Sequence, residues 1–325
     1  MKEDTSMIAV SGLTKSYRTH RVLGGIDLTV ARGEIFALLG PNGAGKTTTV
    51  NILTTLIKPD AGSAHINGID VLHEPKRVRS SISLTGQYAS VDEFLTGEEN
   101  LAMMCTLAHL SGRARTSRSA ELLEQFDLVD AAQRRVDTYS GGMRRRLDLA
   151  ISLIARPPVV FLDEPTTGLD PRSRIQMWAV VRELAEAGTT ILLTTQYLEE
   201  ADQLADAVAV IDGGTVIAHG TPTELKRAVR AEHVELTFAD QRSFDAARSM
   251  SIEGVSASAE ALSIQVATQA PVATIRELLA AADLHGLAIA GIEIVKPTLD
   301  DVFLTLTGHD AGVPATATAN EGIAA

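Results

Sequence analysis

The chain has 325 residues, 45% of them hydrophobic, and a formal net charge of -12 at pH 7. This length is enough for one full core and a small second domain, and the acidic balance argues against a broad nucleic-acid surface. The only cysteine, Cys105, excludes an internal disulfide and favours a reducing compartment. The sequence also lacks an apolar run of membrane-spanning length, and its N-terminus is too polar for a signal peptide.

The first region predicts antiparallel strands followed by a phosphate-binding loop. Hydrophobic residues alternate between residues 7 and 30, and residues 35–39 form an apolar run typical of a buried strand. The sequence GPNGAGKTT at 40–48 then fits the pattern G-x-x-x-x-G-K-[ST] before a predicted helix. Its backbone N–H groups would surround an anion, with Lys46 on the β- and γ-phosphates and the Thr47 hydroxyl on Mg²⁺. The predicted ATP-binding residues of this loop are Gly40, Pro41, Asn42, Gly43, Ala44, Gly45, Lys46, Thr47 and Thr48.

Between residues 88 and 145 the pattern becomes helical and predicts an inserted helical subdomain. We expect the polar run SGRARTSR at 111–118 to break it into two helices. YSGGMRRRL follows at 139–147, where Ser140 can cap a helix and leave N–H groups free for an anion. Residues 144–146 are three arginines, which more often form a solvated helix face than a phosphate track.

The sequence VVFLDEP at 159–165 predicts the second half of a nucleotide site. Four apolar residues indicate a central parallel strand, and two carboxylates emerge at its carboxyl end, where ligands bind in open α/β sheets. A hard cation and an in-line attack by water each need a carboxylate, so we assign Asp163 to Mg²⁺ and Glu164 to the general base. Strands at 190–194 and 207–211, alternating with helices, would complete the sheet.

The last third has a different organisation. Predicted strands at 233–238, 254–257, 261–267 and 288–294, with helices at 243–250 and 272–283, give the order βαββαβ of a ferredoxin-like domain. A short helix at 299–307 begins with Asp300 and Asp301, which we interpret as acids that stabilise its N-terminus. The small, alanine-rich residues of 309–325 predict a disordered tail.

In order and spacing these segments resemble the nucleotide-binding subunits of ATP-binding cassette (ABC) transporters. The resemblance covers about residues 7–225 and is specific, because YSGGM occupies the place of the LSGGQ signature that other phosphate-loop ATPases lack. It implies that two ATP molecules are held between two subunits. Ser140, Gly141 and Gly142 would contact the γ-phosphate bound by the partner. Without the resemblance, SGG alone would indicate a flexible loop.

Further positions follow from the resemblance one at a time. Tyr17 matches the aromatic residue that stacks on adenine. Gln87 matches a glutamine in the Mg²⁺ or water shell, and Asp170 matches the loop that crosses to the partner site. Gln196 stands where the family usually has a histidine that contacts the γ-phosphate, and an amide can donate a hydrogen bond but cannot shuttle a proton.

The resemblance implies the following function. The predicted fold is an α/β phosphate-loop NTPase with a helical and an antiparallel β subdomain (1–231) and a small α+β domain (232–308). The catalytic residues would be Glu164, Gln196 and Lys46; ATP and Mg²⁺ would be the cofactors, with Thr47, Gln87 and Asp163 at the metal. We expect a homodimer and a separate membrane permease that docks near residues 88–100, at the cytoplasmic face of a bacterial membrane.

The YSGGM and TTQYLEEAD sequences are similar to those of daunorubicin and doxorubicin resistance ATP-binding proteins, which favours export of a bulky amphipathic compound, such as an antibiotic or drug. An ATPase of an importer or of a lipid or polysaccharide transporter is the alternative. A soluble ribosome- or DNA-associated relative is a third, although such proteins usually carry two cassettes or a long coiled coil.

Overall fold

The computed structural model describes residues 6–86, 90–229, 232–249 and 255–307. Contacts divide the chain into two compact units, Met1–Pro222 and Thr223–Ala325. The sequence predicts the domain boundary between residues 231 and 232, nine residues after the division between the two units. Helix α8 (Pro222–Val229) lies between these two positions, so the predicted boundary stays a prediction. Gln87 and the tail at 309–325, both named above, lie outside the described residues.

The first unit begins with an antiparallel sheet, as its alternating hydrophobic pattern predicts. The strands are β1 (Ser6–Tyr17), β2 (His20–Ala31), β4 (Ala61–Ile66) and β5 (Ile69–Asp70), in the order β2-β1-β4-β5. Its inward side chains, among them Met7, Ile8 and Leu13, join one hydrophobic core with the second sheet.

The second sheet of this unit carries the predicted site. It has the order β10-β9-β3-β8-β7-β6, and every pairing except the β9–β10 hairpin is parallel. The strands are β3 (Ile35–Leu39), β6 (Ile82–Thr85), β7 (Val159–Asp163), β8 (Thr190–Thr195), β9 (Ala207–Asp212) and β10 (Thr215–Gly220). All residues of β3, β7 and β8 are buried, and the apolar runs at 35–39 and 159–162 predict this burial for β3 and β7.

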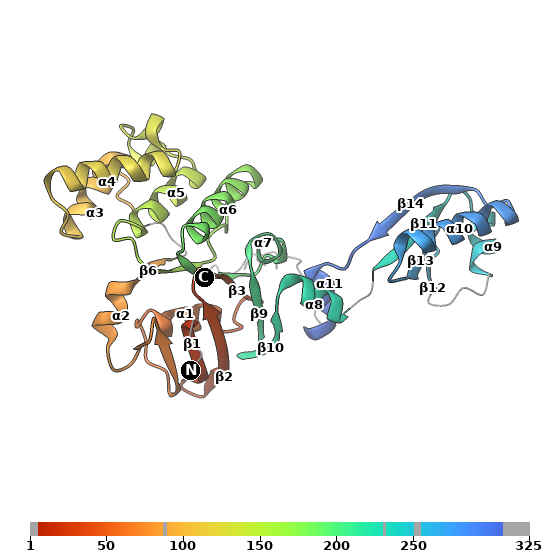
Figure 1. The fold of residues 1–325 in the computed structure, drawn as a ribbon, viewed down its shortest axis with the longest axis horizontal. Helices are drawn as coiled ribbons and strands as arrows, with labels where there is room; N and C mark the ends of the chain where they lie inside the picture. Colours follow the sequence, from red (N-terminus) through yellow and green to blue (C-terminus); the bar gives the residue numbers. More distant parts are fainter. Residues whose placement is uncertain (1–5, 87–89, 230–231, 250–254, 308–325) are drawn as a thin grey trace, which may run out of the picture. The chain divides into compact units, whose positions relative to one another are not determined.

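Helices flank this sheet, and three of them, α3, α4 and α5, gather into a helical subdomain (Figure 1). The helices of the unit are α1 (Lys46–Leu53), α2 (Pro75–Ser81), α3 (Gly97–Leu107), α4 (Gly112–Gln125), α5 (Gly141–Ser152), α6 (Pro171–Glu186) and α7 (Leu198–Leu204), with short 3-10 turns at Val129–Ala131 and Val136–Thr138. None of the helices in the described parts of the chain is long and apolar enough to span a membrane.

The helical region is broken into two helices, as predicted, but most of the polar run at 111–118 is not the break. It forms the first half of α4, and the connection is limited to residues 108–111. The reason is Arg118, whose buried guanidinium donates to the carbonyls of Leu153 (2.5 Å) and Ile154 (3.3 Å) at the end of α5. A helix C-terminus leaves such carbonyls unpaired, and a cation there is favourable.

The second unit contains the ferredoxin-like fold that the sequence predicts. Its elements are α8, β11 (His233–Phe238), α9 (Gln241–Arg248), β12 (Val255–Ser258), β13 (Ser263–Ala267), α10 (Pro271–His285), β14 (Ile289–Val295) and α11 (Leu299–Thr307). The sheet order is β12-β13-β11-β14, all antiparallel, and α9 and α10 pack against it. At the start of α11, Asp301 accepts from the Thr298 backbone N–H at 2.8 Å, and its own N–H donates to the Thr298 hydroxyl at 3.3 Å. This reciprocal cap accounts for one of the two acids at 300–301.

Candidate functional site

The carboxyl ends of four parallel strands bring the predicted site residues to one edge of the sheet. Thr85 pairs with Leu162, Asp163 with Thr194, and Leu39 with Thr195. The chain leaves β3 into the phosphate loop, β7 into Glu164 and β8 into Gln196, so segments far apart in sequence meet there. This is the edge at which open α/β sheets bind ligands.

Glycines shape the phosphate loop. A Cβ on Gly40 would lie 2.2 Å from the Ile211 carbonyl oxygen, so only glycine fits there without a shift of the backbone. Gly43 (φ 85°) and Gly45 (φ 107°) adopt the left-handed region, and Gly45 caps α1. The loop thus leads directly into the N-terminus of α1, an arrangement suited to binding an anion.

The Lys46 side chain is buried within this loop. Its Nζ donates to the carbonyls of Gly40 (2.8 Å) and Pro41 (3.1 Å) and lies 3.6 Å from Oε1 of Glu164. Burial lowers the pKa of Lys46, and the Glu164 carboxylate opposes that shift.

Asp163 and Thr47 form a small oxygen cluster beside the loop. The Thr47 hydroxyl donates to Oδ1 of Asp163 at 3.2 Å, and the Thr194 hydroxyl donates to the same oxygen at 2.5 Å. One carboxylate and one hydroxyl suit Mg²⁺, which usually takes few protein ligands and completes its shell with water and phosphate. Within the described residues, no group of three or more His, Cys, Asp or Glu side chains is arranged to hold a metal ion.

Glu164 has an unusual backbone conformation. Its φ of 48° lies in the left-handed region, which is rare for a residue with a side chain and is often found at functional sites. Its N–H donates to the Thr194 hydroxyl and carbonyl, both at 3.1 Å, and Thr167 donates to Oε2 at 3.2 Å. These bonds hold the carboxylate at the edge of the sheet, where it can accept a proton from water.

The signature segment begins α5. The Ser140 hydroxyl accepts from the Met143 N–H at 3.2 Å, which is the helix cap that the sequence predicts. A Cβ on Gly142 would lie 2.4 Å from Oγ of Ser173, so the start of α5 closely approaches the start of α6. Asp170 caps α6 through Ser173, with bonds of 3.0 Å to its N–H and 2.6 Å to its hydroxyl, and these bonds lower the pKa of Asp170.

Two predicted residues lie at the margins. Tyr17 ends β1, with its ring about half exposed, and the Lys15 ammonium lies 5.6 Å from the ring centroid. Gln196 directly follows β8 and is half-buried. The structure therefore brings four of the predicted residues together in two pairs: Lys46 lies beside Glu164, and Thr47 donates to Asp163.

The interpretation of residues 144–146 as a solvated face was wrong. Arg145 is buried and donates to the carbonyls of Gly86 and Pro165, while Arg144 forms an ion pair with Glu93 and Arg146 with Asp127. These partners lie far away in the sequence. In the sequence itself, only the spacing of Arg145 and Asp148, one helical turn apart, could have indicated an ion pair.

A second buried group was also missed. Glu200, in α7, is fully buried, and the only tryptophan, Trp178 of α6, donates to its Oε1 at 3.2 Å. Burial raises the pKa of Glu200, opposed in part by the hydroxyl of Thr195. Glu200 therefore contacts Thr195, the residue that precedes Gln196.

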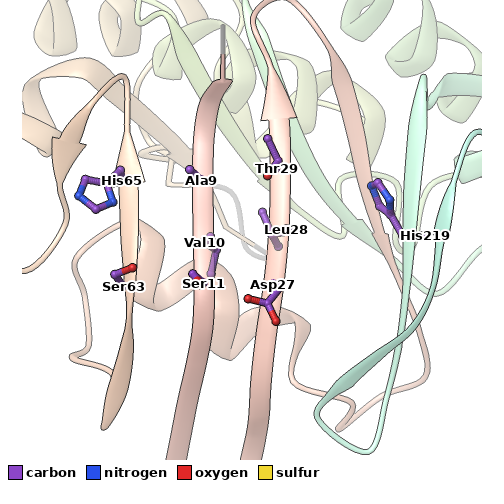
Figure 2. Close-up of a pocket in the computed structure, with 9 residues that line it drawn as sticks. All are labelled: Ala9, Val10, Ser11, Asp27, Leu28, Thr29, Ser63, His65 and His219. Atoms are coloured by element: carbon purple, nitrogen blue, oxygen red, sulfur yellow. The ribbon is translucent and has the colours of Figure 1, made fainter. Parts of the chain in front are cut away.

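A shallow hollow of 490 Å³ lies elsewhere in the first unit. Figure 2 shows its lining on neighbouring strands, with His65 on β4, Asp27 on β2 and His219 on β10. None of the predicted site residues lines it. The nucleotide site therefore has to be argued from the phosphate loop and not from this hollow.

Comparison with known proteins gives the same picture. The profile of the ABC transporter family matches residues 23–167, and that of the ATP-binding protein DrrA1-3-like C-terminal domain matches residues 220–307. The daunorubicin/doxorubicin resistance ATP-binding protein DrrA of Streptomyces peucetius is 50% identical over 313 residues, 95% of this chain and 94% of its own. The daunorubicin resistance ATP-binding protein DrrA2 of Streptomyces coeruleorubidus is 49% identical over 310 residues, 94% of this chain and 96% of its own.

Among solved structures, the chain resembles a dimeric post-hydrolysis state of the ATP-binding cassette MJ0796 bound to ADP and Pi. The TM-score is 0.60 with 26% identity, covering 66% of this chain and 98% of that one. The chain thus has relatives that match it over almost its whole length. It also has the phosphate loop, the carboxylates at the end of β7 and the capped signature helix. The chain therefore belongs to the ABC transporter family, as an ATP-hydrolysing subunit with a DrrA-type C-terminal domain.

Proposed function

We propose that this subunit hydrolyses Mg-ATP to power a separate membrane permease that exports a bulky amphipathic compound, with an antibiotic or drug as the substrate class. The observation that carries the proposal is the similarity over almost the whole chain to two drug-resistance ATP-binding proteins. The C-terminal match at 220–307 strengthens it, because that region lies outside the catalytic motifs.

In this proposal the site residues divide the chemistry. Lys46 and the N–H groups of the phosphate loop bind the phosphates, and Tyr17 stacks on the adenine. Thr47 and Asp163 would hold Mg²⁺, which screens the phosphate charge, with Gln87 in the same shell. Glu164 accepts the proton of the attacking water, and Gln196 donates to the terminal phosphate.

The active form would be a homodimer with two shared sites. Helix α5 begins at Gly141, directly after its cap Ser140, and a helix N-terminus is favourable for an anion. Asp170 begins α6 beside it and would reach toward the second copy. The dimeric form of the related cassette MJ0796 supports this arrangement.

The subunit would work peripherally, at the cytoplasmic face of a bacterial membrane, by docking on its permease. The test first asks whether a multi-span membrane protein is encoded in an adjacent gene, and then expresses the two together in a drug-sensitive bacterium, with daunorubicin as the probe. We expect co-purification, higher drug tolerance and faster efflux. The Glu164→Gln variant should lose both the higher tolerance and the faster efflux. Absence of both co-purification and tolerance would refute export, and dependence on a solute-binding protein would favour an importer.

A further inference from the structure

Arg145 connects the signature helix to the catalytic edge of its own subunit. It lies in α5, and its guanidinium donates to three backbone carbonyls outside that helix: Pro165 at 2.9 Å, Gly86 at 2.5 Å and Asp163 at 3.3 Å. Asp163 and Pro165 are the two neighbours of Glu164 in the chain. The guanidinium of Arg145 therefore bonds to the backbone on both sides of Glu164.

Asp148, one turn further along α5, completes the connection. Its Oδ1 accepts from the Ser90 N–H at 2.8 Å, and its Oδ2 lies 3.5 Å from Nη1 of Arg145. Both side chains are more than nine-tenths buried. Gly86 and Ser90, the residues on either side of 87–89, are thus each bonded to a member of the same pair.

A buried ion pair is weak evidence for stability, because desolvation of the two charges offsets their attraction. Here, however, the two side chains bond to three backbone carbonyls and one backbone N–H, which belong to two separate segments of the chain, 86–90 and 163–165. Arg145 is also well suited to this, because its planar fork can reach several acceptors in fixed directions.

We propose that Arg145 and Asp148 are a positioning pair through which α5 sets the position of Glu164 and of the backbone at Gly86 and Ser90. The inference rests on the proposed function, in which Glu164 activates water and the Ser140 end of α5 binds the partner's nucleotide. A helix from Gly141 to Ser152 moves as one body, so a shift at its first turn is carried to Arg145 and Asp148. Nucleotide in one site would then influence the carboxylate of the other, which is a coupling between two sites.

The adjacent arginine provides a matched control. Arg146 is also mostly buried, and its Nη1 donates to the Phe126 carbonyl at 3.0 Å and lies 3.1 Å from Oδ2 of Asp127. Those partners belong to the helical subdomain alone. Arg146→Gln therefore removes comparable bonds from the same helix without touching the catalytic edge.

The experiment compares full-length wild type, Arg145→Gln, Arg145→Lys and Arg146→Gln by Mg-ATP hydrolysis, ATP binding and thermal unfolding. We expect Arg145→Gln to lower kcat on the order of 100-fold, the loss expected when a reacting group is displaced by about 1 Å. The Kd for ATP should change little, because the phosphate loop is intact. The Hill coefficient should fall toward one. Arg145→Lys should not restore kcat, since an ammonium cannot reach the three carbonyls together.

Arg146→Gln should lower the unfolding midpoint and leave kcat and the Hill coefficient unchanged. If Arg145→Gln fails to fold, the double variant Arg145→Gln/Asp148→Asn removes both charges together and should show the same loss of kcat. A folded Arg145 variant with wild-type kcat at saturating ATP would overturn the proposal. So would a loss matched by Arg146→Gln.

These outcomes differ from a failure of the proposed function. A wild-type Hill coefficient of one, with no ATP-dependent dimer of Glu164→Gln, would refute the shared site. The loss of kcat in Arg145→Gln would then still support positioning of Glu164 within one subunit, and its absence would still overturn it.

Discussion

The Nζ of Lys46 lies 3.6 Å from Oε1 of Glu164, and both side chains are at least nine-tenths buried. The ammonium compensates a carboxylate that would otherwise be buried without a countercharge. Phosphate oxygens of a nucleotide would compete for the same ammonium. ATP binding would then free Glu164 to accept a proton from water, so one contact links binding to chemistry.

Lys46→Ala tests the binding half of this relationship. Loss of a charge-assisted bond worth about 1.5–3 kcal/mol should weaken ATP binding roughly 10- to 150-fold. Equilibrium dialysis with ATP measures this directly. Lys58→Ala, at an exposed lysine near the same helix, is the control and should bind as the wild type does. Unchanged affinity in Lys46→Ala would contradict the assignment of Lys46 to the phosphates.

Glu164→Gln tests the chemical half. The amide keeps the size of the side chain but cannot take a proton, so ATP should bind and remain intact. Gel filtration with saturating Mg-ATP should then show a stable dimer, and a second change, Lys46→Ala, should return it to the monomer. A monomer for the single variant would count heavily against the shared site.

The sequence was sufficient for the local backbone geometry of the candidate site. Gly40, Gly45 and Lys46 follow from the backbone geometry of one loop, and the buried strands follow from uninterrupted apolar runs. The ferredoxin-like order was equally readable, because each of its elements has its own period and turn.

The parts that could not be predicted depend on contacts between distant segments. Arg145 belongs to a run of three arginines whose helix position indicates solvent, yet its acceptors at residues 86, 163 and 165 lie at the carboxyl ends of β6 and β7. Arg118 was missed for the same reason, since its acceptors lie at the end of α5. A guanidinium satisfied by backbone carbonyls leaves no signature in the sequence around it.

Gln196→His restores the residue usual in the family. An imidazole can hold a proton near neutral pH, which an amide cannot, so kcat should rise, by up to about 100-fold. The rise should be accompanied by a new inflection of the pH–rate profile near pH ~6.5. Gln196→Met keeps the length without the hydrogen bond and should reduce kcat. An unchanged or lower rate with histidine would mean that the site has adapted to the amide.

Glu200 should make the stability of the protein depend on pH. Burial raises its pKa, so the folded state holds the proton more tightly than the unfolded state. Its contribution is fully present below the unfolded pKa of 4.5 and is lost as the pH rises through the raised value. The neighbouring Arg174 opposes the shift only in part, and it does not change the sign.

Glu200→Gln removes this titration and keeps an acceptor for the Trp178 N–H. The unfolding midpoint of the variant relative to the wild type should therefore increase as the pH is raised from 4.5, and other titrating groups cancel in the difference. Trp178 is the only tryptophan, so its fluorescence reports the unfolding. A difference in midpoint that is constant with pH would show that Glu200 is charged in the folded protein.

Gly142→Ala separates the structural role of the signature glycines from their role at the nucleotide. The new Cβ would lie 2.4 Å from Oγ and 2.7 Å from Cβ of Ser173, so α5 and α6 would have to move apart. We expect a loss of about 1–3 kcal/mol of unfolding free energy, as for other overpacked contacts. Ser173→Gly should recover much of that loss in a double-mutant cycle.

Gly141→Ala is the control. The atom nearest to a new Cβ at Gly141 is Cδ2 of Leu169 at 4.0 Å, so this variant should keep the stability and weaken only the ATP-dependent dimer of Glu164→Gln. Equal destabilisation by the two alanines, measured by urea unfolding, would mean that the contact with Ser173 does not govern the packing of these helix ends.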